Sequence, residues 1–342
     1  MLGQEVFWFD EIGQEDNDLV GKKCANLGEL ARLRMPVPSG FAISVKAEER
    51  FLNVTGALRD IQELLNEVGE LKDINLQAEV SEKIRHIVES KEIPTDLCDA
   101  IRTHYEELCH RRGQEVAVSV RSAGAKSHPG QYETYLNVRG DQRVLEMVKK
   151  VWASIFNART IANLVHLGLP VAQSPAIGVG VVEMVYARSA GVCFTIHPVT
   201  GDPLKAVIEA NWGLGESVVS GKVNTDMYVV DKELLEVIER NLGGKHMQIV
   251  AKEEGVVEEE TPTEKQSAFV LNNDEAVEIV KLGKALELHF RGPQDIEWAI
   301  DDEHSFPNNV FLLQTRPVVG VKVQKPKTTE EKLLDDLVKY FR

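Results

Sequence analysis

Gln294-Asp295-Ile296-Glu297-Trp298 is followed, sixteen residues after Asp295, by Phe311-Leu312-Leu313-Gln314-Thr315-Arg316-Pro317. In a β-strand the side chains at positions i and i+2 share one face. Asp295 and Glu297 therefore point together, and so do Gln314 and Arg316. On two neighbouring strands, these residues place two carboxylates, an amide and a guanidinium on one face.

This set of side chains suits a magnesium-bound triphosphate. Mg²⁺ prefers hard oxygen ligands and usually takes one or two carboxylates from the protein, while phosphate oxygens and water complete its coordination. Glu297 and Gln314 are the predicted metal ligands with Asp295 beside them, and Arg316 is the predicted phosphate clamp. A solvated β-hairpin with scattered charge is the alternative that these two segments leave open. Because an exposed charge loss changes stability by no more than about 0.5 kcal/mol, Arg316→Ala is expected to leave the fold intact.

Composition narrows the possible functions. The chain has 342 residues, enough for two or three domains with ample core. Its 39 Lys+Arg against 54 Asp+Glu give a net charge of −15, so a nucleic-acid surface is not expected and any polyanion site must be a local concentration of positive groups. Four cysteines without paired spacing indicate reduced thiols rather than disulfides or a zinc site. We find no signal peptide or membrane-spanning apolar run, so we expect a cytoplasmic protein without a membrane partner.

Hydrophobic periodicity and turn residues predict an alternation of strands and helices. The expected elements are a strand, a helix opening near Lys23 and a second strand within residues 5–44, helices over 46–112, a strand from Val116 to Val120 that leads into an Arg121 loop, a helix from Met147 to Leu167, a strand at 176–182, mostly strands over 178–250, a helix from Asn273 to Phe290 and an amphipathic helical tail over 322–342.

Six further motifs stand upstream of residues 294–317, in the order Leu19–Leu30, Met35–Phe41, Val118–Gly124, Ser127–Thr134, Ser189–Thr195 and Ile208–Glu216. The ordered set resembles the ATP-binding, ATP-grasp-like part of the phosphoenolpyruvate synthase and pyruvate phosphate dikinase family, over roughly residues 15–320. The resemblance implies an α+β, two-lobed nucleotide-binding fold with a helical insert. Its expected parts are an N-terminal lobe (1–180) with the phosphate-binding loop and the insert (about 46–112), a C-terminal ATP-grasp lobe (181–322) with the metal site, and the tail (323–342).

The resemblance also implies which residues contact phosphate. Lys23 aligns with a lysine that contacts nucleotide phosphate, as a mobile point charge can, while Lys22 replaces a family glycine. Arg121 would offer a planar guanidinium group that can contact phosphate through two N–H groups. The loop over the β- and γ-phosphates would contain three further residues, which are Gly124, Gly130 and Thr134. His128 lies in the same loop, where the family has no histidine, and we assign it a surface or loop-packing role rather than that of a phosphocarrier.

The remaining implied contacts lie on the nucleoside side. Met184 follows a strand where the resembling enzymes present backbone to adenine, so the expected hinge runs from Glu183 through Met184 to Val185. The family often has glutamine two residues before that methionine, and Val182 stands here instead, which puts one adenine contact in doubt. Glu209 is assigned to ribose or to ordering the phosphate arginines, with a structural salt bridge as an equal alternative.

The resembling enzymes pass a phosphoryl group from ATP to a histidine on a swivelling domain, which carries it to an acceptor domain. None of the nine histidines stands in the Thr/Ser-His-Ala context of that carrier. We therefore expect the ATP-binding subunit of a split dikinase, active with a histidine-carrying partner subunit, which uses Mg²⁺ and ATP and releases AMP and phosphate. Phenol, as in phenylphosphate synthase, is the first expected acceptor. The alternatives are a split phosphoenolpyruvate synthase acting on pyruvate, a subunit acting on another small hydroxyl acceptor, a nucleotide-sensing regulatory subunit without turnover, and a scaffold that only holds a partner.

Overall fold

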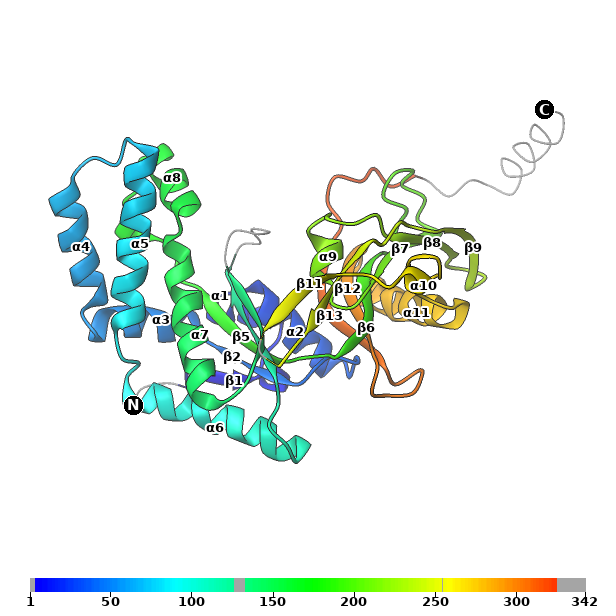
Figure 1. Cartoon of the computed structure of the whole chain (residues 1–342), viewed down its shortest axis with the longest axis horizontal. Helices are drawn as coiled ribbons and strands as arrows, with labels where there is room; N and C mark the ends of the chain where they lie inside the picture. Colours follow the sequence, from blue (N-terminus) through cyan, green and yellow to red (C-terminus); the bar gives the residue numbers. More distant parts are fainter. Residues whose placement is uncertain (1–3, 126–132, 254, 325–342) are drawn as a thin grey trace. The chain divides into compact units, whose positions relative to one another are not determined.

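The computed structural model describes residues 4–125, 133–253 and 255–324. The chain divides into two compact units, the first comprising Met1–Val185 with Ala251–Val257 and the second comprising Tyr186–Val250 with Glu258–Arg342. The mixture of helices and strands agrees with the expected α+β class (Figure 1). Among the described residues no helix is both long enough and apolar enough to cross a bilayer.

Unit 1 is built on a five-stranded antiparallel sheet with the order β1-β2-β5-β3-β4. Its strands are β1 (Val6–Trp8), β2 (Gly40–Ile43), β3 (Val118–Ala123), β4 (Thr134–Val138) and β5 (Gly178–Glu183). Between them lie helices α1 (Asn17–Val20), α2 (Lys22–Arg32), α3 (Val45–Val54), α4 (Ala57–Val68), α5 (Ile74–Ser90), α6 (Thr95–Arg112), α7 (Asp141–Ala153) and α8 (Ala158–His166). Short 3₁₀ helices occupy Phe9–Glu11, Gln14–Asp16, Ser154–Phe156 and Val171–Gln173.

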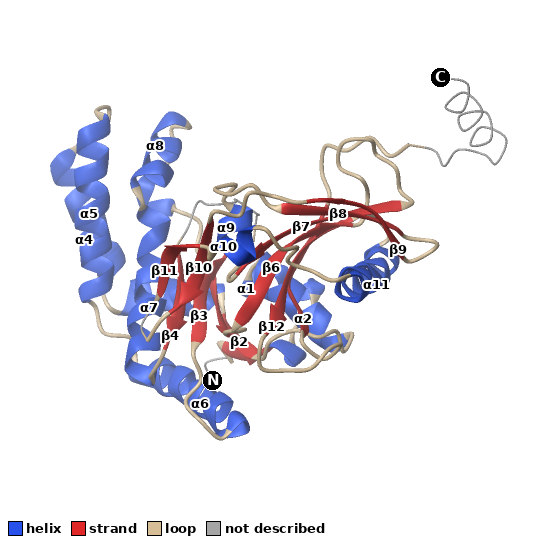
Figure 2. Cartoon of the chain, turned by 45° about the vertical axis from the view of Figure 1, so that its right-hand side comes forward, coloured by secondary structure: helices blue, strands red, loops and turns tan. Residues whose placement is uncertain are grey.

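The two faces of this sheet are covered by different helices. Val118 and Val120 of β3 join Val179 and Val181 of β5 in a core that also takes residues of α3 to α8. Ala123 and Val182 join Cys24 and other residues of α2 in a smaller core on the opposite face. This separation follows from the two-residue period of side chains along a strand. Helices α4, α5, α7 and α8 lie side by side in both ribbon views (Figures 1 and 2).

Unit 2 is built on a six-stranded antiparallel sheet with the order β13-β12-β6-β7-β8-β9. Its strands are β6 (Ala187–Phe194), β7 (Lys205–Trp212), β8 (Asp226–Asp231), β9 (Glu236–Asn241), β12 (Gln294–Asp301) and β13 (Val310–Pro317). Helix α11 (Asn273–Phe290) packs against this sheet (Figure 2). Asn272 caps α11 with its side chain and forms a capping box with Glu275, which confirms the predicted helix start.

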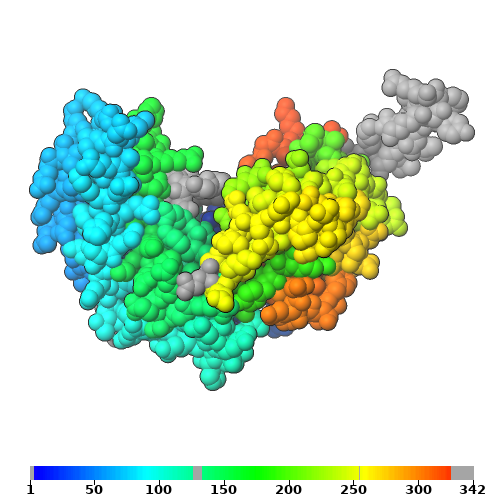
Figure 3. Space-filling view, viewed as in Figure 1, coloured from blue at the N-terminus to red at the C-terminus, as the bar shows by residue number. Residues whose placement is uncertain are grey.

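A separate hairpin is formed by β10 (Met247–Ala251) and β11 (Val256–Glu260), and it lies at the surface in the space-filling view, coloured yellow (Figure 3). The short helices α9 (Glu216–Val219) and α10 (Thr263–Gln266) complete unit 2. At the hairpin tip, in unit 1, the Asn137 amide nitrogen donates hydrogen bonds to the carbonyls of Lys252 (2.5 Å) and Gly255 (3.0 Å).

Two expected elements differ from the structure. Arg121 lies within β3 rather than in a loop after it, because pairing with β4 and β5 continues the strand to Ala123. The helix expected from Met147 to Leu167 is two helices, α7 and α8, since the chain is extended at Asn157, whose side chain caps α8 by accepting from Thr160 N–H. The expected tail helix over 322–342 and the loop residues His128 and Gly130 fall largely or wholly outside the described residues.

Candidate nucleotide site

The first cluster is a row of polar side chains across β12 and β13. Asp295 lies directly opposite Arg316, and Glu297 lies directly opposite Gln314. Opposed residues in an antiparallel pair share a face, so the structure confirms that these four residues stand together. Ile296 points to the other face, where it approaches Gly283 of α11. A register shift follows Glu297, and bulges of this kind re-aim side chains beside functional sites.

Asp295 and Arg316 form an ion pair within this row. Nε and Nη2 of Arg316 both lie 2.7 Å from Oδ2 of Asp295. The Asp295 side chain is 10% exposed and that of Arg316 is 34% exposed. One carboxylate oxygen of Asp295 therefore orients the guanidinium, which sequence reasoning had treated as an independent phosphate clamp.

The row fits a magnesium ion shared with phosphate. Asp295 Oδ1 is buried and has no hydrogen-bond partner among the described residues, and a hard cation would satisfy such an oxygen. No group of three or more His, Cys, Asp or Glu side chains in the described residues could hold a metal ion. A site made by Asp295, Glu297 and the Gln314 amide therefore depends on phosphate and water for its other ligands, as magnesium sites commonly do.

Glu209 lies on the same face of the sheet as Glu297. Glu297 is opposite Val192 of β6, and Val192 is opposite Glu209 of β7, so the two carboxylates stand two strand spacings apart, about 10 Å. The hydroxyl of Thr225 donates to Glu209 Oε2 at 3.5 Å. The role of Glu209, in binding ribose, in ordering the phosphate arginines or in a structural ion pair, stays a prediction.

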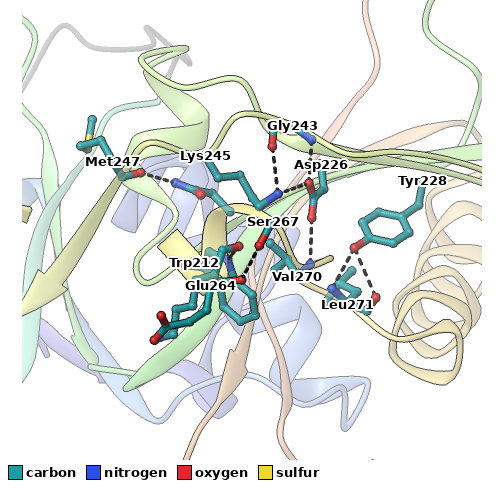
Figure 4. A network of polar contacts seen from close by, with 12 residues as sticks. Trp212, Asp226, Tyr228, Gly243, Lys245, Met247, Glu264, Ser267, Val270 and Leu271 are labelled. Atoms are coloured by element: carbon teal, nitrogen blue, oxygen red, sulfur yellow. Dashed lines mark hydrogen bonds and ion pairs between the residues drawn. The ribbon is translucent and has the colours of Figure 1, made fainter. Parts of the chain in front are cut away.

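A buried ion pair fixes the start of β8 next to Thr225, and sequence reasoning missed it. Asp226 Oδ1 accepts from Lys245 Nζ at 2.5 Å and from Gly243 N–H at 2.8 Å, while Oδ2 accepts from Val270 N–H at 2.8 Å (Figure 4). Both charged side chains are fully buried. Lys245 Nζ also donates to Gly243 O. Burying two charges is costly unless their remaining donors and acceptors are also hydrogen-bonded, and the hydrogen bonds of this pair provide that. The partners are far apart in sequence, and no local pattern signals their contact.

The second cluster lies in unit 1, where the start of α2 meets the end of β3. Lys22 N–H donates to Gly124 O at 3.0 Å. Gly21 has φ +79°, and a Cβ there would lie 1.8 Å from Ala123 O. Only glycine permits this approach. The contact brings the first turn of α2 beside Gly124, the only glycine of the predicted phosphate loop that the described residues include.

The charges of Lys23 and Arg121 both influence the thiol of Cys24. Burial raises the pKa of Cys24 to about 12, and the positive charges of Arg121 and Lys23 act in the opposite direction. A Cβ on Gly180 would lie 3.1 Å from Cys24 Sγ and 3.4 Å from Arg121 Cγ. The Arg121 side chain therefore begins on the α2 face of the sheet. The structure brings Lys23 and Arg121 into one electropositive neighbourhood at the start of α2.

Thr134 joins this neighbourhood through strand pairing. It lies opposite Arg121 in the β3–β4 register, so its side chain shares the α2 face with the guanidinium. The exposed Thr134 hydroxyl can donate to an anion beside Arg121. Lys23, Arg121, Gly124 and Thr134 are thus close together, whereas Gly130 lies outside the described residues.

The predicted adenine hinge follows β5. Glu183 forms a bidentate ion pair with Arg112, with Nε 2.7 Å from Oε1 and Nη2 2.8 Å from Oε2. Glu183 N–H donates to Ser39 O, and Met184 N–H donates to Ala117 O. Val185 N–H makes no backbone hydrogen bond among the described residues, so it can donate to a base. Arg112 therefore holds the Glu183 carboxylate, so at the predicted hinge only the backbone of Glu183 is left for a contact with the base.

Comparison with known proteins identifies one family over nearly the whole chain. The family model described as pyruvate phosphate dikinase, AMP/ATP-binding domain, matches residues 17–336. The chain is 37% identical over 357 residues to a probable phosphoenolpyruvate synthase of Staphylothermus marinus, covering 96% of this chain and 43% of that protein. For a probable phosphoenolpyruvate synthase of Archaeoglobus fulgidus the identity is 39% over 332 residues, covering 95% and 43%. For the phosphoenolpyruvate synthase of Aeropyrum pernix it is 36% over 348 residues, covering 91% and 42%.

The chain thus spans less than half the length of these curated relatives. Their names refer to phosphoenolpyruvate and not to phenol. The comparisons therefore support the pyruvate-directed alternative better than the phenylphosphate expectation, which stays without support.

Proposed function

Because the chain belongs to the AMP/ATP-binding domain family of pyruvate phosphate dikinase, we propose that it is the Mg-ATP-binding part of a phosphoenolpyruvate synthase-type dikinase with an ATP-grasp-like nucleotide site. In this proposal a histidine outside the chain's ATP-binding region accepts a pyrophosphoryl group from ATP, and AMP leaves. The γ-phosphate is then lost to water, and the phosphohistidine that remains phosphorylates pyruvate.

The observation that carries the proposal is the row formed by Asp295, Glu297, Gln314 and Arg316. A structural hairpin needs neither a buried carboxylate oxygen without a hydrogen bond nor a guanidinium that the same carboxylate orients. Both features have a use if the row binds magnesium and phosphate. A scaffold without nucleotide would not need them.

The residues have distinct tasks in this proposal. Arg316 binds a phosphate oxygen, and Asp295 holds its guanidinium in place. Lys23, Arg121 and Thr134 bind phosphate oxygens, and the Val185 N–H binds the base. When present, Mg²⁺ would neutralise charge that develops on the transferring phosphoryl groups. Phosphoryl transfer needs little from the protein beyond such positioning and electrostatic stabilisation.

Radiolabelled ATP tests this assignment. The chain is incubated with Mg-ATP labelled at the β or the γ position, together with the histidine-bearing domain or partner that serves it, and with or without pyruvate. We expect AMP as the nucleotide product, an acid-labile histidine adduct that keeps the β label, and the γ label in free phosphate. Formation of ADP with the γ label on the acceptor would refute a dikinase. A chain that binds ATP without any turnover would favour the nucleotide-sensing alternative.

A further inference from the structure

Glu133, at the start of β4, is held by three groups from the helical side of unit 1. The Nη2 atom of Arg85, on α5, lies 2.8 Å from Oε1 and 3.0 Å from Oε2 of Glu133. The Tyr135 hydroxyl donates to Oε2. The backbone N–H of Glu133 donates to Ser154 Oγ at 3.3 Å, and that hydroxyl in turn donates to Val151 O at 2.7 Å. We call Arg85, Tyr135 and Ser154 the Glu133 socket.

The socket lies on the face of the unit 1 sheet opposite the side chains of Arg121 and Thr134. Tyr135 is opposite Val120, and both belong to the core beneath α3 to α8. Thr134 is opposite Arg121, whose side chain starts on the α2 face. Since side chains alternate along a strand, holding residues 133 and 135 on the helical face fixes Thr134 on the phosphate face. A turn of the backbone at Glu133 would move the Thr134 hydroxyl away from Arg121.

The stability gained from this ion pair is small. The side chains of Arg85 and Glu133 are 30% and 35% exposed, and ion pairs at such exposure contribute little to folding. Burial raises the pKa of Tyr135, and the hydrogen bond to Glu133 raises it further. The tyrosine therefore stays protonated and donates to the carboxylate at all moderate pH values. A socket of two donors to the carboxylate and one acceptor for the backbone N–H, around one partly exposed residue, is better suited to fixing geometry than to stabilising the fold.

We propose that Arg85 is a positioning residue for binding of the ATP β- and γ-phosphates, acting through Glu133 to place Thr134 beside Arg121. This inference rests on the proposed function. It assigns a role in nucleotide binding to α5, a helix of the insert that carries none of the predicted nucleotide contacts.

The test compares the affinities of the full chain for Mg-ATP and for AMP by calorimetry. Arg85→Met removes the charge while keeping a long apolar side chain. Lys83→Met is the matched control, because Lys83 lies on the same helix and pairs with Glu79 at an exposed position. Tyr135→Phe removes only the hydroxyl donor, so it tests the socket if Arg85→Met does not fold. Melting curves verify that each variant is folded.

We expect Arg85→Met to weaken Mg-ATP binding about tenfold, because small misplacements at a phosphate site are costly. AMP lacks the two outer phosphates, so its affinity should stay within about twofold. Tyr135→Phe should weaken Mg-ATP binding in the same selective way but less, and Lys83→Met should change neither affinity. Unchanged ATP affinity in the folded Arg85 and Tyr135 variants, or equal loss for ATP and AMP, would overturn the inference while leaving the proposed function standing. Failure of the unaltered chain to bind ATP would overturn both.

Discussion

Removing Arg316 tests the geometry of the β12–β13 row through protein stability. Arg316→Ala withdraws Nε and Nη2, the two nitrogens that contact Asp295 Oδ2, and Oδ1 already lacks a partner among the described residues. The carboxylate is 10% exposed. Leaving a charged acceptor unpaired at such a site costs about 1–3 kcal/mol. We place the loss in this range rather than at the larger cost of breaking a fully buried pair, because the 34% exposed Arg316 side chain gives water access once it is truncated.

This value corrects the expectation of no more than about 0.5 kcal/mol, which treated Arg316 as an exposed charge. The free energy of unfolding is measured by urea denaturation for the unaltered chain, Arg316→Ala, Asp295→Asn and the double variant. In the Asp295→Asn background no buried charge is left behind, so Arg316→Ala should cost less, with a coupling free energy of about 1–2 kcal/mol. Lys222→Ala, which removes a pair exposed on both sides, is the control and should cause no resolvable change. Equal costs of Arg316→Ala in both backgrounds would refute the pairing on which the row depends.

Three further predictions concern the metal, the packing beneath Arg121 and a buried acid. Glu297→Gln and Gln314→Ala should each raise the magnesium concentration for half-saturation about tenfold, roughly 1.4 kcal/mol, with a smaller change in nucleotide affinity. An unchanged magnesium requirement in nucleotide-binding titrations would show that these two residues are not metal ligands. Gly180→Ala places a methyl group 3.1 Å from Cys24 Sγ and should lower the free energy of unfolding by about 1–3 kcal/mol. In a Cys24→Ala background, denaturation should show a smaller loss. An equal loss in both backgrounds would contradict the contact between Gly180 and Cys24. Burial raises the pKa of Glu48 well above its usual 4.5, so the folded state keeps a proton that the unfolded state loses. The stability of the folded state should therefore fall as the pH rises above 4.5. Glu48→Gln should flatten this fall in melting curves recorded from pH 5 to 8, and parallel pH profiles for the two proteins would contradict the prediction.

Local sequence patterns were sufficient to predict most helices and strands and the residues that make up the β12–β13 row. The i, i+2 rule placed Asp295 with Glu297 and Gln314 with Arg316, and the register then brought the two pairs face to face. The helix expected from Asn273 to Phe290 is α11, and the structure shows Asn272 as its cap. The expected lobe boundaries and the partner subunit stay predictions, because no observation on this chain tests them.

Features that depend on long-range contacts were not predictable in this way. The extension of β3 through Arg121 depends on pairing with strands that follow it in sequence. The two glycines of β5 reflect close approaches, since a Cβ on Gly180 would meet Cys24 Sγ of α2 and a Cβ on Gly178 would meet Val20 O. The Asp226–Lys245 pair and the Glu133 socket join residues from separate elements, and neither leaves a periodic trace in the sequence.

The most direct test of the account is a crystal structure of the chain with Mg²⁺ and a non-hydrolysable ATP analogue. The account predicts a magnesium ion with a carboxylate oxygen of Glu297 at about 2.1 Å, the Gln314 amide oxygen among its ligands, and Arg316 in contact with a phosphate oxygen while still paired with Asp295. A triphosphate bound with its metal away from Glu297 and Gln314, or an Arg316 that contacts no phosphate, would contradict the assignment of this row as the metal and phosphate site.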